Sequence, residues 1–130
     1  MLILSIWTDK PQAEIGLFDS QKKLAYHKWH AHRDLAATIH TKIHKLLKDQ
    51  KKNWQDIEGL VCYKGPGSFT GLRIGLTVAN ILAENLKAPI IGITGLAWCE
   101  KGIQALLDGK TDKIALPEYG SDAHITKPKK

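Results

Sequence analysis

The most constraining stretch of this sequence is a glycine-rich turn that joins a short apolar run to a long helical pattern. Residues 60–63 are apolar and residues 71–87 have helical periodicity, so the turn leads from a strand into a helix. Its residues are Gly65, Pro66, Gly67, Ser68, Phe69 and Thr70. Glycine permits close backbone approach and unusual angles, proline stiffens the chain between the glycines, and Ser68 or Thr70 can cap the helix.

Two interpretations of this turn remain open on spacing alone. The helix N-terminus and its free N–H groups can hold a phosphate, or the turn can be a rigid corner that aims the helix. The run has neither the lysine of a P-loop nor the spacing G-x-G-x-x-G, which favours the corner. Ser68 does not lie in a G-x-S-x-G elbow, so we expect a capping role for it and not a nucleophilic one.

The rest of the chain predicts an α/β protein with the order βββαβαβα and a mixed five-stranded sheet. Strands are predicted at residues 2–7, 13–17, 24–29, 57–63 and 89–93, and helices at 33–50, 71–87 and 95–107, with Thr94 as the cap of the last helix. In the second strand, Ala13, Ile15 and Leu17 alternate with Glu14 and Gly16. We predict one lobe at residues 1–107, followed by a turn, a short strand at 114–116 and a basic tail within residues 108–130.

Charge and cysteine content restrict the classes of function. The formal charge is +6, and lysines cluster at residues 48–52 and 127–130; such clusters attract nucleic acid, although a solvated helix end and a frayed tail are the favoured interpretation. Two cysteines make no disulfide framework, so we expect a reducing, cytoplasmic location and inert thiols. No run is long enough to span a membrane.

The second long helix has more apolar surface than a sheet alone can cover. Small residues recur at every fourth position from Gly71 to Ala83, which allows another helix to approach closely. Either the first helix covers this excess within the domain, or a partner's helix pair docks there, which is the sharper hypothesis. The expected partner surface consists of Leu35, Ile39, Ile43, Leu72, Gly75, Leu76, Ala79 and Ala83.

His40 and His44 lie one helical turn apart and share a face. An HxxxH pair can bind a metal ion, but the chain offers no glutamate as in HExxH and no obvious third ligand. We therefore expect a solvated or interfacial histidine face and predict no metal site.

The turn and the start of its helix resemble the motif of the TsaB family, also called YeaZ, of Gcp-like (glycoprotease-like) proteins. The matching motif residues are Gly65, Pro66, Gly67, Ser68, Phe69, Thr70, Gly71 and Arg73, and weaker similarity covers residues 2–98. The resemblance implies one lobe of the actin-like ATPase (ribonuclease H-like) fold. It also implies a role in forming threonylcarbamoyladenosine (t6A) on tRNA, as the non-catalytic partner that binds a TsaD-like subunit through its first two helices. A TsaE-like ATPase and tRNA are expected to join through the complex, and a homodimer is expected when the chain is alone.

The chain departs from the family pattern at two places. The aspartate at the end of the first strand is replaced by Trp7, which is followed by Thr8, and Asp9 comes two residues late. Most of a second lobe is absent after Trp98, while residues 114–119 resemble the closing segment of the family, which suggests an internal deletion. Both departures predict no cofactor and no enzymatic activity in this chain. The alternatives are a small actin-like nucleotide-binding phosphotransferase or hydrolase, and a homodimeric interaction module.

Overall fold

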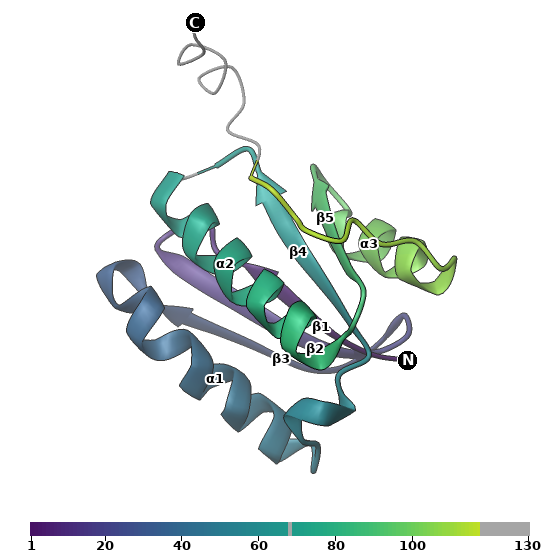
Figure 1. Cartoon of the computed structure of the whole chain (residues 1–130). Coiled ribbons are helices and arrows are strands. Elements are labelled where there is room, and N and C mark those ends of the chain that lie inside the picture. Colours follow the sequence, from purple (N-terminus) through teal and green to yellow (C-terminus); the bar gives the residue numbers. More distant parts are fainter. Residues whose placement is uncertain (68, 118–130) are drawn as a thin grey trace, which may run out of the picture.

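The computed structural model describes residues 1–67 and 69–117 and is built around a mixed five-stranded sheet with the order β3-β2-β1-β4-β5 (Figure 1). The first three strands form an antiparallel meander, and β4 and β5 run parallel to β1. The strands are β1 (Leu2–Trp7), β2 (Gln12–Asp19), β3 (Lys22–His30), β4 (Gly59–Gly65) and β5 (Ile90–Thr94). This sheet confirms the predicted mixed, five-stranded α/β architecture.

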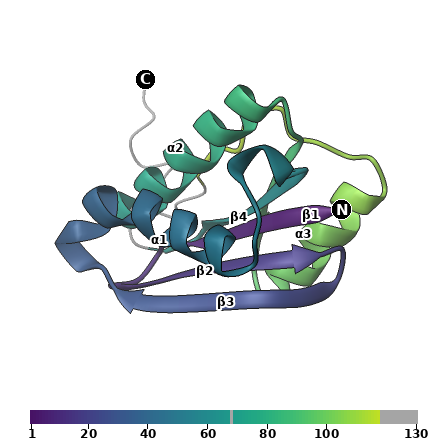
Figure 2. The ribbon, with the colours of Figure 1, turned by 90° about the horizontal axis from the view of Figure 1, so that it is seen from below.

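Three helices cover the sheet. The helices α1 (Leu35–Asp49) and α2 (Phe69–Leu86) lie side by side on one face, whereas α3 (Trp98–Leu107) packs on the other (Figures 1 and 2). Two short 3-10 turns, at His32–Asp34 and Trp54–Asp56, flank α1. α1 and α2 therefore form one layer on the sheet, and α3 forms the other.

The core has two layers because β1 is buried on both faces. Leu4 and Ile6 point toward α1 and α2, whereas Ile3 points toward α3 and packs with Val61 and Ile103. Successive side chains of a strand point to opposite faces, so a central strand with continuous apolar sequence supplies both layers. β4, which leads into the motif turn, pairs with β1. The motif turn therefore follows a strand at the buried centre of the sheet.

The outer edge of β5 is covered by the chain that follows α3. The Asp112 backbone N–H donates to the Ile90 carbonyl at 2.8 Å, and the Gly92 N–H donates to Asp112 Oδ2 at 2.7 Å. Ala115 donates its N–H to Asn80 Oδ1 and accepts from Asn80 Nδ2, each at 2.8 Å. The predicted strand at residues 114–116 is therefore wrong, because the backbone groups of Ala115 bond to a side chain and not to a neighbouring strand.

One further local prediction is corrected. The third helix begins at Trp98, after Ala97 in a left-handed conformation (φ 57°), while Thr94 ends β5 and does not cap the helix. Glu14 is 6% exposed and lies on the face of β2 opposite to Ala13 and Ile15. The boundary at residue 107 stays a prediction, and the tail from residue 118, with Lys127, lies outside the described residues. Within the described ranges, no helix is both long and apolar enough to cross a membrane.

Candidate functional site

The motif turn lies where β4 ends at Gly65 and α2 begins at Phe69, next to the end of β1. The buried Thr8 hydroxyl donates to the Gly71 carbonyl at 2.8 Å. A Cβ on Gly71 would overlap the Thr8 carbonyl oxygen, and a Cβ on Gly75 would overlap Thr8 Oγ1. These glycines let α2 lie directly against the end of β1, so the turn works as a corner. Ser68 lies outside the described residues, and Thr70 is inside the helix and does not cap it.

Asp9 lies beside the motif turn, although the sequence pattern placed it too late to belong there. The space of a Cβ on Gly67 is already occupied by Asp9 Cβ, because the connection from β1 to β2 folds over the turn. Asp9 Oδ1 is buried and, among the described residues, has no hydrogen-bond partner. Burial raises the pKa of this carboxyl group, and Lys10 offsets part of the increase. The structure therefore brings an acidic group to the site that sequence reasoning had left without one.

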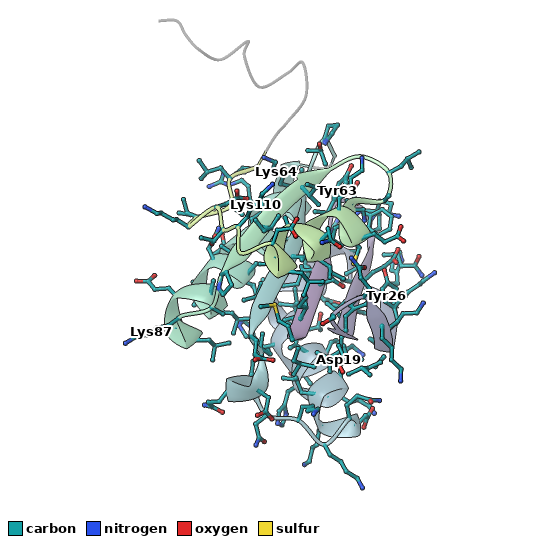
Figure 3. All side chains as sticks on the ribbon, turned by 90° about the vertical axis from the view of Figure 1, so that its right-hand side faces the viewer. Asp19, Tyr26, Tyr63, Lys64, Lys87 and Lys110 are labelled. Carbon is teal, nitrogen blue, oxygen red and sulfur yellow. The ribbon has the colours of Figure 1, made fainter. Side chains whose placement is uncertain are left out.

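The position of the expected aspartate is filled by a packed indole. Trp7, Tyr63 and Trp98 form an aromatic cluster with ring centroids 5.7 to 5.8 Å apart. Lys10 Nζ lies 3.8 Å from the centre of the Trp7 ring, and the Tyr63 hydroxyl donates to the Pro66 carbonyl at 2.9 Å. Figure 3 shows Tyr63 and Asp19 at opposite ends of the sheet. The cluster braces the motif turn, and an indole has no oxygen with which to bind magnesium.

A buried carboxylate lies on the α3 side of the sheet. Glu14 accepts a hydrogen bond from the Tyr26 hydroxyl at 2.6 Å, and Lys10 Nζ lies 3.7 Å from its other oxygen. Burial raises the pKa of Tyr26, and the bond to Glu14 adds to this effect. Sequence reasoning missed this contact. Alternation along β2 indicates the face of the sheet on which Glu14 lies, but it does not indicate that the Tyr26 hydroxyl of β3 lies next to it.

The two thiols are shielded, in line with the expectation of low reactivity. Cys62 is fully buried and Cys99 half-buried. Burial raises the pKa of Cys62, and it raises the pKa of Cys99 to about 11. Since the thiolate is the reactive form, neither cysteine is set up as a nucleophile.

The residues expected to face a partner lie instead in the chain's own core. Ala79 is 0% and Ala83 5% exposed, and a Cβ on Gly75 would overlap the Thr8 side chain of the same molecule. All eight are buried: Leu35, Ile39, Ile43, Leu72, Gly75, Leu76, Ala79 and Ala83. The expected surface is therefore corrected, because the small side chains of α2 serve its close approach to β1 and the sheet. A partner contact through α1 and α2 stays a prediction that must rest on their outward residues.

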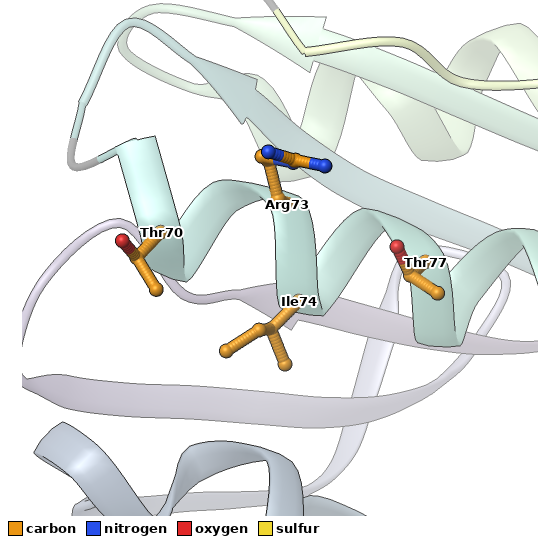
Figure 4. Close-up of a pocket in the computed structure, with 4 residues that line it drawn as sticks. All are labelled: Thr70, Arg73, Ile74 and Thr77. Atoms are coloured by element: carbon orange, nitrogen blue, oxygen red, sulfur yellow. The ribbon is translucent and has the colours of Figure 1, made fainter.

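The outward side of α2 carries a shallow hollow. A volume of about 340 Å³ is lined by Thr70, Arg73, Ile74 and Thr77 (Figure 4). Ile74 points toward α1 (Figure 4). A second hollow is lined by Leu35 and Ile74, among other residues. Two turns beyond Ile74, Ile81 is 51% exposed. The outward surface thus combines apolar and polar side chains along the seam between the two helices.

The histidines of α1 are not arranged around a common metal position. The His44 ring is stacked on Trp54, with centroids 6.4 Å apart and planes at 3°, and His40 is exposed. Across the residues that the structure describes, no group of three or more His, Cys, Asp or Glu side chains is placed to hold a metal ion.

Comparison with known proteins identifies the family. A family model described as TsaD, tRNA N6-adenosine threonylcarbamoyltransferase, matches residues 29–117. The tRNA threonylcarbamoyladenosine biosynthesis protein TsaB of Bacillus subtilis (strain 168) is 34% identical over 96 residues, which cover 74% of this chain and 42% of that protein. The chain belongs to the TsaB (YeaZ) family. The structure of YeaZ from Pseudomonas aeruginosa matches with a TM-score of 0.67 and 25% identity, over 74% of this chain and 45% of that one.

A more distant structural similarity supports the fold of this TsaB-family chain and nothing about its function. RuvC of T. thermophilus, solved in complex with a Holliday junction substrate, superposes with a TM-score of 0.53 at 12% identity, over 95% of this chain and 87% of that one. With the YeaZ match, this establishes the ribonuclease H-like α/β fold that the sequence predicted. The chain spans less than half the length of the TsaB and YeaZ proteins named above.

Proposed function

We propose that this chain is a non-catalytic, TsaB-like subunit in the formation of t6A on tRNA. Its relatives bear the name of this biosynthesis, and the family model bears the name of the transferase. In this proposal a TsaD-like subunit transfers the threonylcarbamoyl group, and a TsaE-like ATPase and tRNA join through the complex, in the cytoplasm. The observation that carries the proposal is the motif turn, whose glycines pack α2 against Thr8.

The end of β1 supports a structural role over a catalytic one. Trp7 occupies the position of the expected acidic ligand and packs against Tyr63 and Trp98. The polar groups next to it, Lys10 and the Tyr63 hydroxyl, are engaged with the Trp7 ring and the Pro66 carbonyl. We therefore expect no cofactor, and no hydrolysis of ATP by the isolated chain.

The partner surface in this proposal is the outward seam of α1 and α2. Ile81 is half exposed and Ile74 partly so, and Ala36 and Ala37 of α1 are exposed. Small and apolar side chains along two neighbouring helices suit a partner's helix pair, since exposed apolar surface of this kind marks interaction sites. The same seam would join two copies when the TsaD-like subunit is absent.

The test is a charge placed on the seam. Ile81→Glu would bury an unpaired carboxylate at the contact, which costs several kcal/mol and should weaken binding roughly 100-fold or more. Leu96→Glu is the matched control, because Leu96 is 93% exposed and lies between β5 and α3. Light scattering and calorimetry with and without a TsaD-like subunit measure association. Equal affinity of both variants would contradict the proposed surface, and no association of the unmodified chain would contradict the proposed function.

A nucleotide-binding phosphotransferase or hydrolase is the second candidate, favoured by the position of Asp9 beside Gly67. Calorimetry with ATP and magnesium separates the two. Under the first proposal binding is weak or absent, and Asp9→Asn does not change it. Micromolar binding that disappears in Asp9→Asn would favour the enzyme.

A further inference from the structure

Positive charge is concentrated on one edge of the molecule. Residues 22–52 contain nine lysines and arginines but only two aspartates, a formal charge of +7, whereas the rest of the chain sums to −1 of the total +6. Five of the six histidines also fall within residues 22–52. These residues form β3, the short 3-10 turn after it and α1, which lie together at the side of the sheet away from β5 (Figure 2).

The cations of this edge come from both sides of β3. We define the basic edge as Lys22, Lys23 and Lys28 of β3 with Lys42, Lys45 and Lys48 of α1. Lys28 pairs in register with Glu14, on the α3 side, whereas Trp29, one residue on, donates its Nε1–H to Thr38 of α1 at 3.0 Å. Lys42 Nζ is 6.0 Å from the centre of the Trp29 ring, so this lysine also faces β3. The edge strand thus has ammonium groups above and below it.

Few of these charges are neutralised within the chain. Among the described residues, the only salt bridge of the basic edge joins Lys45 to Asp49 at 3.1 Å, and both side chains are well exposed. Exposed pairs of this kind contribute little. β3 is the last strand on its side, and no other strand of the described chain pairs with its outer edge.

The chemistry of the edge fits a phosphate backbone better than a lipid surface. An interfacial helix needs large apolar side chains to insert into a membrane, and α1 exposes none within the described chain. Aromatic rings lie next to the lysines instead: Lys23 Nζ is 5.2 Å from the centre of the Tyr26 ring, and Lys42 lies near Trp29. Lysines interleaved with aromatic rings are typical of surfaces that bind nucleic acid.

We propose that the basic edge, formed by β3 and the β3-facing side of α1, binds the phosphate backbone of RNA. That this RNA is tRNA rests on the proposed function. The edge is separate from the outward seam at Ile81, so one chain can bind RNA and a protein partner at the same time. The basic edge would then give the complex a second contact with its substrate.

The test compares two triple variants of the full chain with equal change in charge. Lys28→Ala/Lys42→Ala/Lys45→Ala removes half of the basic edge, and Lys87→Ala/Lys101→Ala/Lys110→Ala removes three exposed lysines elsewhere. Fluorescence anisotropy measures the affinity for an unmodified tRNA transcript between 50 and 200 mM salt. We expect the edge variant to bind about tenfold or more weakly, with a salt slope shallower by about 2 to 3, and the control to stay within about twofold.

Three results would overturn the inference: no binding of tRNA by the unmodified chain, equal losses in both variants, or edge-dependent binding to phosphatidylserine vesicles without edge-dependent binding to tRNA. Circular dichroism checks folding. If the edge variant is unfolded, protection of Lys28 and Lys42, but not Lys87, from acetylation by bound tRNA supports the proposal, and equal protection refutes it.

A parallel association assay with a TsaD-like subunit separates this inference from the proposed function. The edge variant should keep its affinity for that subunit, because its three lysines lie off the seam. Binding of tRNA through the edge without any association with the subunit would refute the proposed function and leave this inference standing. The opposite pair of results would refute only this inference.

Discussion

His27 is a histidine whose surroundings in the fold disfavour its protonated form. It is partly buried on β3, its ring is stacked on Trp29 at 5.7 Å, and its Nε2 is buried without a hydrogen-bond partner among the described residues. Burial lowers the pKa of His27 below 6.5, and the positive charges of Lys42 and Lys45 on α1 lower it further. The same lysines that form the basic edge therefore keep this imidazole neutral.

We expect His27 to make the protein less stable in mild acid. The unfolded chain takes up a proton near pH 6.5 while the folded chain does not, so stability is lost as the pH falls from 6.5 toward the lowered pKa. In His27→Gln the fall in melting temperature between pH 7.5 and pH 5.5 should be smaller. His40→Gln, at an exposed position of α1, is the control, and an identical pH dependence in His27→Gln and the unmodified chain would contradict the prediction.

At the scale of elements, the contact between α2 and the end of β1 explains why the motif turn acts as a rigid corner between β4 and α2. Thr8 is 1% exposed and bonds to the Gly71 carbonyl, while Gly75 contacts its side chain one turn later. Ala79 and Ala83 continue this buried row along α2. The small residues thus select the distance between α2 and the sheet, a packing role inside one chain.

Gly75→Ala should destabilise the fold by about 1 to 3 kcal/mol, because the new methyl group overlaps Thr8 Oγ1 in a packed interior. Gly109→Ala is not a suitable control, since Gly109 has a φ of 83°. Thr77→Ala, on the exposed side of α2, should change stability by less than about 0.5 kcal/mol. Urea denaturation followed by circular dichroism measures both, and equal midpoints would show that α2 does not rest on Thr8.

The same packing predicts that the fold does not tolerate a charge at Ala79. Since Ala79 is 0% exposed, Ala79→Glu should unfold the isolated chain through the several kcal/mol needed to bury a carboxylate. A folded, monomeric Ala79→Glu protein with unchanged thermal stability would contradict this prediction and would show that Ala79 lies on the outward surface of α2.

At the scale of the whole molecule, the two sheet edges are treated differently. The β5 edge is closed by residues 111–115 through Asp112 and the Asn80–Ala115 pair, whereas β3 is bordered by lysines. Lysines on an edge strand discourage pairing with other strands. Both edges are therefore protected from pairing with another chain: the β5 edge by residues 111–115, and the β3 edge by its positive charge.

Ending the chain after Leu107 should therefore weaken the fold relative to ending it after Pro117. The loss includes the bonds of Asp112 to Ile90 and Gly92 and the pair between Ala115 and Asn80. At about 1 kcal/mol for each bond, the free energy of unfolding should fall by roughly 3 to 5 kcal/mol. Thermal denaturation of the two chains measures this, and equal melting temperatures would support residue 107 as the end of an independent lobe.

Local sequence patterns were enough to predict most of the elements, the mixed sheet and the family, because these depend on near neighbours in the chain. Alternation along residues 13–17, spacing of Leu35, Ile39 and Ile43, and the contiguous motif at Gly65 are all local patterns. They establish which residues are buried, but not which surface buries them.

The contacts of those residues join distant parts of the chain, so they are seen in the folded structure and not in the sequence. Thr8 and Gly71 are 63 positions apart and Asp9 and Gly67 are 58 apart, so no local pattern contains either contact. The apolar excess of α2 looks the same in sequence whether a partner or the chain's own sheet covers it, and the structure assigns it to the sheet. The concentration of charge could be counted along the sequence, but the placement of β3 beside α1, which brings that charge to one edge, required the fold.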